Sequence, residues 1–188
     1  MRTAYIGMGG NLASWAGPPE ATLAAAAVRL GRLGRVVCRS SLYRTAPVGF
    51  AEQPRFVNAV VALETELEPR ELLKSLLAVE QEFGRDRTTG FTNGPRTLDL
   101  DILLLGDLKL SEPGLEIPHP RMTERSFVLV PLCEIAPAIF DASRQTTVAQ
   151  LLHSLFPSPT STNDAVEKVQ IDGWRAGADR GGSLPGEP

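Results

Sequence analysis

The amino-acid sequence predicts an α+β sandwich, with a mainly antiparallel sheet and helices on one face. The order of apolar segments is strand, helix, strand, strand, helix, strand, which makes two βαβ-like halves. The 188 residues have an ordinary globular composition, 43% hydrophobic and 22% charged, which is enough for one sizeable core. No internal repeat and no apolar run of membrane-spanning length interrupts this order.

Glycine and proline mark the limits of the first strand and the first helix. Residues 3–8 predict a short strand that runs into Gly9 and Gly10, where the backbone either approaches a ligand closely or makes an ordinary turn. Pro19 opens the following helix, because proline is tolerated in a first helical turn, and Gly31 ends it.

Two β-rich segments follow. Residues 35–45 alternate in polarity and predict a strand, residues 46–54 contain two prolines and predict a loop, and residues 56–67 predict another strand. Asn58 lies on the face of that strand opposite Val57. An amide there is either a functional hydrogen-bonding group or a solvated side chain.

The second helix starts at Pro69 and ends at Gly84, with leucines at three- and four-residue spacing. Glu80 lies on or beside this apolar stripe, either at the rim of the core or against a ligand at the end of the helix. Residues 85–93 lack apolar periodicity and predict a mobile loop. Its arginines either close over a phosphate chain or lie in solvent.

Residues 94–105, GPRTLDLDILLL, predict a strand with one arginine and two aspartates before an apolar run. Side chains two apart on a strand share a face, so Asp99 and Asp101 point the same way, about 6.5 Å apart. Such a pair can hold divalent ions, and Arg96 can grip phosphate oxygens. The alternative, a strand with one solvated face, is disfavoured because aspartate is depleted in strands and like charges repel.

The rest of the chain predicts a hairpin and two helices. Residues 106–107 suit a hairpin turn into residues 108–110. Prolines on both sides of His119 keep it extended, for a functional or a structural reason. Helices are expected over residues 121–131 and 146–155.

These elements fit one domain over residues 1–156. Residues 157–188 are rich in Ser, Pro and Gly and predict a loosely ordered tail, with one added strand within residues 166–171.

Charge and cysteine usage exclude several classes of protein. A net charge of −3 argues against a general binder of nucleic acid or anionic membranes. Of the 19 basic residues, 16 are arginines, and several crowd around residues 84–96 and 121–125, which indicates a local anion site. Cys38 and Cys133 lie in apolar stretches and are expected to be buried free thiols. No signal peptide is recognised, so we expect a cytoplasmic protein.

The segment GPRTLDLDILLLG resembles the signature of the 6-hydroxymethyl-7,8-dihydropterin pyrophosphokinase family of folate biosynthesis. AYIGMGGNL, SSLYRTAPVG, QPRFVNAVVALET, EFGR and IPHPRMTERSFVLVPLCEIAP match further family blocks, in order, between residues 3 and 137. The resemblance implies a ferredoxin-like α/β sandwich, with a mainly antiparallel sheet and helices packed on it. It also implies transfer of the β,γ-pyrophosphoryl unit of ATP, the co-substrate, to the pterin's hydroxymethyl oxygen, which leaves AMP.

The resemblance implies a role for individual residues as well. Asp99 and Asp101 would hold two Mg²⁺ ions that bridge the triphosphate, and would act in catalysis with Arg85 and Arg96. The nucleotide-site positions are Leu73, Glu80, Arg87, Ile102, His119 and Arg125. The pterin-site positions are Thr45, Ala46 and Val48 through their backbone, Asn58 through its side chain, and the stacking rings Phe56 and Phe127.

Some positions depart from the family pattern. Asn93 stands where the family often has tryptophan, so either Phe91 covers the site instead or the loop closes over it less tightly. Leu77 replaces a nucleotide-contacting glutamine, and Gly114 and Glu116 replace basic or hydroxyl residues. These departures concern contacts with adenine and phosphate rather than the reaction.

Two other functions are disfavoured by the sequence. A ferredoxin-like RNA-binding module would need exposed aromatic residues on central strands and a basic face, and Tyr5 and Tyr43 are too few. An inactive relative that serves as a scaffold is disfavoured by the intact acidic and basic signature residues. We therefore expect a monomer whose partners are two small-molecule substrates, with no nucleic acid and no membrane.

Overall fold

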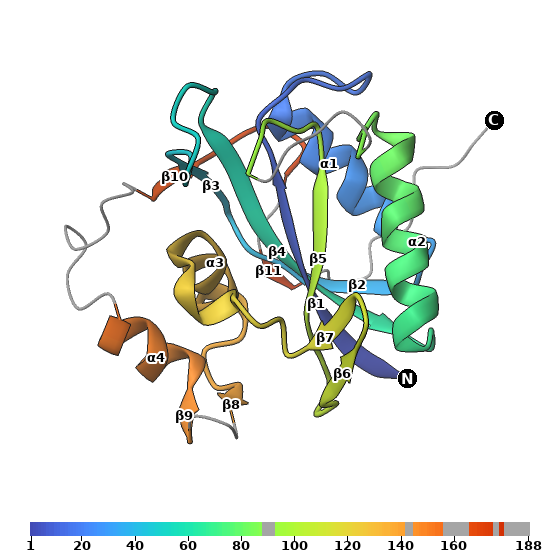
Figure 1. The fold of residues 1–188 in the computed structure, drawn as a ribbon, viewed down its shortest axis with the longest axis vertical. Coiled ribbons are helices and arrows are strands. Elements are labelled where there is room, and N and C mark those ends of the chain that lie inside the picture. The colour runs from blue at the N-terminus through green and yellow to red at the C-terminus, as the bar shows by residue number, and fades with distance from the viewer. Residues whose placement is uncertain (88–92, 142–144, 156–165, 175–176, 179–188) are drawn as a thin grey trace.

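A seven-stranded antiparallel sheet forms the centre of the described structure (Figure 1). The computed structural model describes residues 1–87, 93–141, 145–155, 166–174 and 177–178. The sheet strands are β1 (Arg2–Gly10), β2 (Arg35–Arg39), β3 (Leu42–Thr45), β4 (Phe56–Thr65), β5 (Asp99–Leu105), β10 (Glu167–Val169) and β11 (Gly177–Ala178). β4 pairs with β2 and β3 along one edge and with β1 along the other, and β1 also pairs with β5.

Helices cover both faces of this sheet, whereas the sequence analysis placed them on one face. α1 (Pro19–Leu30) and α2 (Pro69–Glu82) lie on one side, and α3 (Ser126–Ile135) and α4 (Val148–Leu155) lie on the other (Figure 1). Alternation along β4 separates two cores: Ala59 and Val61 pack with α1 and α2, while Val60 packs with α3. The prediction failed on α3, which is apolar enough to need a sheet face of its own.

The predicted strand over residues 35–45 is two strands that share one edge of β4. The break falls at Ser40 and Ser41, between β2 and β3. The backbone N–H of Ser40 donates to the carbonyl of Val60, and the Ser40 hydroxyl accepts from the Val60 N–H, both at 2.9 Å. The Ser40 hydroxyl thus takes over a backbone role, a substitution that polarity alternation does not reveal.

The first strand and the third helix also differ from expectation. β1 continues through Gly10, so Gly9 and Gly10 belong to a strand and not to a turn. The helix predicted over residues 121–131 is a short 3-10 turn, η1 (Met122–Glu124), followed by α3, with Arg125 extended between them. Pro131 lies inside α3 rather than at its end.

A hairpin follows β5, but not the one expected. The predicted turn at residues 106–107 is present, yet residues 108–110 do not pair with β5; instead β6 (Leu110–Glu112) pairs with β7 (Leu115–Ile117). The Ile117–Pro118 peptide bond is cis. A second small hairpin of β8 (Phe140–Asp141) and β9 (Thr146–Thr147), which was not predicted, precedes α4.

The chain beyond α4 contributes two strands where it is described. β10 pairs with β3 and lies within the predicted stretch 166–171, and β11 pairs with β2. The predicted looseness of the tail concerns residues 156–165 and 179–188, which lie outside the described residues. The division into a domain and a tail stays a prediction.

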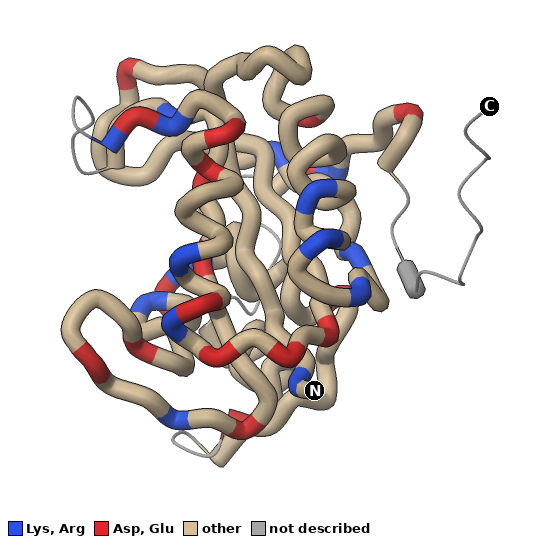
Figure 2. Tube along the Cα trace, turned by 90° about the vertical axis from the view of Figure 1, so that its right-hand side faces the viewer, with Lys and Arg blue, Asp and Glu red and all other residues tan. Residues whose placement is uncertain are grey.

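Acidic and basic residues are interspersed along the trace, in keeping with a net charge of only −3 (Figure 2). Cys38 and Cys133 are free thiols and only partly buried, and burial raises the pKa of each. Among the described residues, no helix combines the length and the apolar character that crossing a membrane requires.

Candidate active site

The two aspartates lie at the start of β5 and line one cavity on the α3 side of the sheet. Leu100 and Ile102, which alternate with them, are buried on the other side, so Asp99 and Asp101 share a face as the strand period requires. The residues that line this cavity are Gly7, Met8, Gly9, Asn58, Ala59, Val60, Arg96, Asp99, Asp101, Leu103, Arg125, Phe127 and Val128. Six predicted site residues therefore meet there: Asn58, Arg96, Asp99, Asp101, Arg125 and Phe127.

Glycines on β1 leave space beside the aspartates. Gly9 lies opposite Asp99 and Gly7 lies opposite Asp101 in the strand register. A Cβ atom on Gly9 would stand 2.9 Å from Oδ1 of Asn58, which is closer than real contacts allow. The absent side chain therefore lets Asn58 turn into the cavity.

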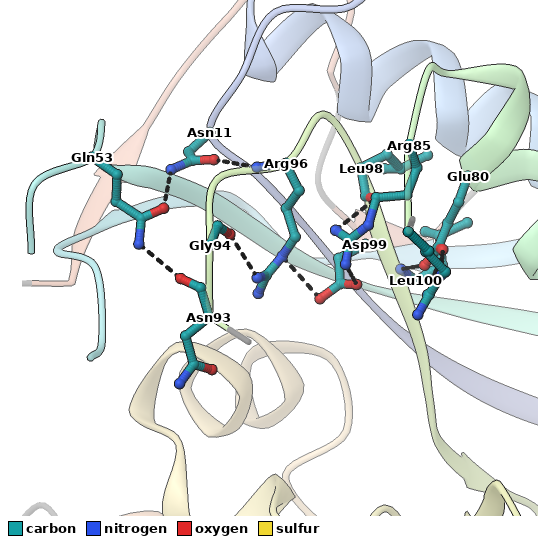
Figure 3. Close-up of polar contacts among 11 residues, drawn as sticks. Asn11, Gln53, Glu80, Arg85, Asn93, Gly94, Arg96, Leu98, Asp99 and Leu100 are labelled. Atoms are coloured by element: carbon teal, nitrogen blue, oxygen red, sulfur yellow. Dashed lines mark hydrogen bonds and ion pairs between the residues drawn. The ribbon is translucent and has the colours of Figure 1, made fainter. Parts of the chain in front are cut away.

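Asp99 is held between two arginines (Figure 3). Its Oδ2 lies 3.1 Å from Nε of Arg96, and its Oδ1 lies 3.4 Å from Nη2 of Arg85. Arg96 Nε is buried, and its ion pair with Asp99 lacks hydrogen-bond geometry. The Arg96 guanidinium also stands over the ring of Phe56, 4.9 Å from its centroid. Burial lowers the pKa of Arg85, and the charge of Asp99 opposes this effect.

Asp101 differs from Asp99, because no hydrogen bond or ion pair joins its carboxylate to a described residue. Burial raises its pKa and the charge of Asp99 raises it further, against the opposing charges of His119, Arg125 and Arg96. The folded protein therefore presents a carboxylate whose negative charge is only partly compensated.

Glu80 is part of the protein interior rather than of the rim. The residue is fully buried, and its Oε1 accepts from the N–H of Leu100 at 2.8 Å (Figure 3). Its Oε2 accepts from Nε of Arg87 at 3.0 Å. Burial raises its pKa, although both hydrogen bonds act in the other direction. Glu80 thus fastens α2 and Arg87 to β5, close to Asp99.

His119 is anchored with a defined tautomer. Its backbone N–H donates to the carbonyl of Leu103 at 2.9 Å, which holds it beside β5. The backbone N–H of Arg121 donates to its Nδ1 at 3.1 Å, so the neutral imidazole carries its proton on Nε2. Burial lowers its pKa and favours this neutral form, although the charge of Asp101 opposes the shift.

Of the predicted pterin-site residues, Asn58 and Phe127 line the cavity. Asn58 is 6% exposed, and its Nδ2 donates to the Thr45 hydroxyl at 2.8 Å, so the amide is bonded and not solvated. Phe127 lines the cavity, and the guanidinium of Arg125 stands over its ring at 5.6 Å. Phe56 reaches the cavity only through Arg96.

Other predicted residues lie further from the cavity. The side chains of Ile102 and Leu73 pack into the core on the α1 and α2 side, so a contact with nucleotide would have to come from that side or from the backbone. Ala46 and Val48 follow β3, and Val48 is exposed. Phe91 lies outside the described residues.

Sequence reasoning missed Asn11 and Gln53. Nδ2 of Asn11 donates to Oε1 of Gln53 at 3.0 Å, and Oδ1 of Asn11 accepts from the N–H of Arg96 at 2.8 Å. Nε2 of Gln53 donates to the carbonyl of Asn93 at 2.8 Å (Figure 3). The available sequence signal was a polar amide, Asn11, directly after the two glycines at the end of the predicted strand. Only the fold shows which loops it joins.

A sheet edge with paired carboxylates, converging arginines and an aromatic and amide wall suits one chemistry: handling phosphate charge beside a flat polar ring. This arrangement in an α/β sandwich is what a transferase that acts on phosphate groups requires.

The family model of 7,8-dihydro-6-hydroxymethylpterin-pyrophosphokinase matches residues 5–137. The chain belongs to this family. The family catalyses ATP-dependent transfer of a pyrophosphoryl group to the hydroxymethyl group of 6-hydroxymethyl-7,8-dihydropterin in folate biosynthesis, and this chain is an enzyme of that activity.

Curated relatives support the same assignment. The 2-amino-4-hydroxy-6-hydroxymethyldihydropteridine pyrophosphokinase of Synechocystis is 43% identical over 154 residues, 81% of this chain and 75% of that protein. The protein of the same name from Pseudomonas aeruginosa is 48% identical over 135 residues, 71% of this chain and 80% of that protein.

Solved structures confirm the fold. The wild-type HPPK-DHPS of Plasmodium falciparum superposes with a TM-score of 0.63 over 86% of this chain and 42% of that chain. The sequence identity is 16%, so this likeness supports the ferredoxin-like α/β architecture alone.

Proposed function

We propose that the cavity at the start of β5 is where this chain carries out pyrophosphoryl transfer, with Asp99, Asp101, Arg85 and Arg96 as its catalytic residues. The observation that carries the proposal is the position of the two carboxylates: both line one cavity with Arg96, Arg125, Asn58 and Phe127. Transfer from ATP requires in-line positioning and charge neutralisation more than covalent chemistry from protein, and these are the groups that supply them.

The residues present fit Mg²⁺. Among the described residues, no three His, Cys, Asp or Glu side chains gather into a closed metal cage. Mg²⁺ does not need one, because it is held by one or two carboxylates together with substrate phosphates. No hydrogen bond or ion pair joins the Asp101 carboxylate to a described residue, and burial raises its pKa, so a bound cation would favour its ionised form. When bound by Asp99 and Asp101, Mg²⁺ supplies charge neutralisation for the polyphosphate.

Arginines would supply the remaining positive charge. The Nε of Arg96 is buried and makes no hydrogen bond, and the guanidinium of Arg85 lies 3.4 Å from the Asp99 carboxylate. Phosphate oxygens would offer both groups better acceptors, and the cationic groups would stabilise the charge that develops as the pyrophosphoryl group leaves AMP. Arg87, Arg125 and His119, the last as a neutral Nε2–H donor, would orient the nucleotide.

The pterin would lie against the wall formed by Asn58, Thr45 and Phe127. A buried amide suits the polar edge of a flat heterocycle, and an aromatic ring suits its face. In this structure Arg96 covers Phe56 and Arg125 covers Phe127, so stacking on either ring requires its arginine to move. Phosphates that draw these arginines away would uncover the rings.

Three further proposals concern the oligomeric state, the cellular location and the extent of the catalytic region. We propose that the chain works as a monomer, in the cytoplasm, and that residues 1–156 carry its catalytic and substrate-binding residues, to which β10 and Trp174 add a strand and a core side chain. An acidic body without a membrane-spanning helix among the described residues supports the second. All predicted site residues lie before residue 128, which supports the assignment of the site to residues 1–156.

The decisive experiment compares Asp101→Asn with the wild-type enzyme. AMP formation from ATP and the hydroxymethyl pterin should fall by about a thousandfold, because a charged group that acts on the transferring phosphate is lost. Calorimetric titration with an unreactive ATP analogue should lose its dependence on Mg²⁺. The melting temperature without metal should stay the same or rise, because the raised pKa shows that the ionised carboxylate is disfavoured in the fold.

Asp107→Asn is the matched control. Asp107 lies in the turn after β5, away from the cavity, and its replacement should change neither turnover nor the effect of Mg²⁺. Full turnover of Asp101→Asn in Mg²⁺ would overturn the assignment of this cavity.

A further inference from the structure

Glu134 makes an unusually complete set of contacts outside the proposed catalytic groups. It lies at the C-terminal end of α3 with a side chain that is 25% exposed. Its Oε2 accepts from the Ser41 N–H at 2.7 Å and from the Tyr43 hydroxyl at 2.9 Å. Its Oε1 accepts from the Ser41 hydroxyl at 2.7 Å and from Nζ of Lys168 at 3.0 Å.

Two of the residues that donate to Glu134 lie in or next to β3, the strand that carries Thr45 and forms one wall of the proposed pterin pocket. Ser41 immediately precedes β3, and Tyr43 lies opposite Asn58 in the register between β3 and β4. Thr45, two residues on and on the same face as Tyr43, accepts the Asn58 amide. A carboxylate that binds Ser41 and Tyr43 therefore fixes the strand that orients Asn58.

Glu134 itself belongs to the helix that forms the other wall. Phe127 precedes it by seven residues, which is two helical turns, so both side chains lie on the same side of α3. Phe127 lines the cavity at one end of the helix while Glu134 is bound to β3 at the other. The helix is consequently held over the sheet near its far end, and this contact limits how far Phe127 can shift relative to Asn58.

The last donor comes from the C-terminal strand. Lys168 lies on β10 opposite Tyr43, and this strand is outside residues 5–137 that the family model matches. Trp174, a few residues further, donates from Nε1 to the carbonyl of Ser40 at 2.8 Å. The chain after α4 thus returns to the same edge of the sheet, and its lysine supplies the cation for Glu134.

We propose that Glu134 is a positioning residue of the pterin pocket, which holds the β3 wall and the α3 wall in register, and that Lys168 of β10 completes it. This proposal rests on the assignment of Asn58 and Phe127 to pterin binding. It concerns affinity for the pterin and not the nucleotide, because Glu134 contacts β3 and β10 and none of the residues on β5.

The test uses two mild variants of the full chain, Tyr43→Phe and Lys168→Met. Each removes one donor to Glu134 and leaves the others in place. Each should raise the KM for the pterin by about threefold to tenfold, as expected for a lost hydrogen bond to a charged group that acts through geometry. The KM for ATP should stay unchanged. The change in kcat should be less than about twofold, which is close to the accuracy of such measurements.

The chain offers matched controls. Tyr5→Phe removes the other tyrosine hydroxyl, on β1, and Arg70→Met removes the cation from the exposed ion pair of Arg70 with Glu112. Neither should change the KM for the pterin. A purely structural role would lower the melting temperature of Tyr43→Phe and leave that KM unchanged, and this result would overturn the proposal.

Phe127→Ala separates this inference from the proposed pocket. If Phe127→Ala raises the KM for the pterin while Tyr43→Phe and Lys168→Met do not, only the role of Glu134 is wrong. If Phe127→Ala also leaves it unchanged, the pocket assignment is wrong. An equal rise in the KM for ATP in the two Glu134-partner variants would also contradict the proposal, because it would show a general loss of site order.

Discussion

At the scale of single residues, a missing side chain matters as much as the charged ones. Gly9 lies on β1 between Asp99 and Asn58, and a Cβ there would come within 2.9 Å of the Asn58 amide oxygen. Asn58 cannot yield easily, because its Nδ2 is bonded to Thr45 in a buried environment. The glycine therefore preserves the orientation of the amide.

We expect Gly9→Ala to raise the KM for the pterin by about tenfold with little change in the KM for ATP, since displacement of one buried amide costs about 1–2 kcal/mol. Steady-state kinetics with each substrate varied in turn would measure this. Gly7→Ala is the comparison on the same strand face, where a Cβ would meet only the flexible Leu103 side chain at 3.3 Å. A larger effect at Gly7 than at Gly9 would contradict the explanation.

The sequence predicts the charged residues of the site better than the groups that position them. Alternation on one strand is enough to put Asp99 and Asp101 on one face, and the structure bears this out. Asn11 could not be found in this way, because its function depends on a loop 42 residues further on. Glu134 could not be found in this way either. Its donors Ser41 and Tyr43 lie 93 and 91 residues earlier, and its donor Lys168 lies 34 residues later.

At the scale of elements, Asn11 links three segments that border the cavity. It connects the end of β1 to Gln53 in the loop before β4 and to Arg96 before β5, and its own N–H donates to the Arg96 carbonyl at 2.9 Å. Gln53 extends the link to Asn93. These hydrogen bonds join the loop next to the proposed pterin site to the segment that carries Arg96, a proposed catalytic residue.

We expect Asn11→Ala to lower kcat by about tenfold to a hundredfold, because misplacement of a catalytic cation by a fraction of an ångström is costly. Gln53→Ala should have a smaller effect, because it leaves the two bonds between Asn11 and the Arg96 backbone intact. Single-turnover kinetics would separate the transfer step from product release. Equal losses in Asn11→Ala and Gln53→Ala would show that the Arg96 backbone contacts are unimportant.

Element prediction succeeded where one local signal decides and failed where partners decide. α2 follows its leucine spacing and Pro69, and lies at Pro69–Glu82 as the pattern indicates. The interruption between β2 and β3 depends on the Ser40 hydroxyl, which takes the place of a carbonyl of its own strand and accepts from the Val60 N–H of β4. The position of α3 depends on which sheet face is free. Neither is a property of the local sequence.

At the scale of the whole molecule, the described residues after α4 return to the sheet and add to its core. Trp174 is 8% exposed and packs with the core on the α1 and α2 side, and its Nε1 donates to the carbonyl of Ser40. Arg39 covers its ring at 5.9 Å. β10 and β11 add the main-chain pairing on either side of this residue. Composition alone placed this segment in a tail, because Trp174 is isolated among Gly, Ala and Arg.

We expect Trp174→Ala to lower the free energy of unfolding by about 3 kcal/mol, the usual cost of truncating a buried aromatic residue. Trp174→Phe should lower it by about 1 kcal/mol, because the ring remains while the bond to Ser40 is lost. Chemical denaturation followed by circular dichroism would measure both. Trp15, the other tryptophan, is the matched control: its Nε1 donates to the carbonyl of Glu82 at 2.9 Å and its ring stacks on Phe83 at 5.1 Å, but it is 69% exposed. Its truncation therefore loses a comparable hydrogen bond and much less buried area. If Trp174→Ala were as stable as Trp15→Ala, the C-terminal strands would be an appendage to the fold, and their lysine could not hold Glu134 in place.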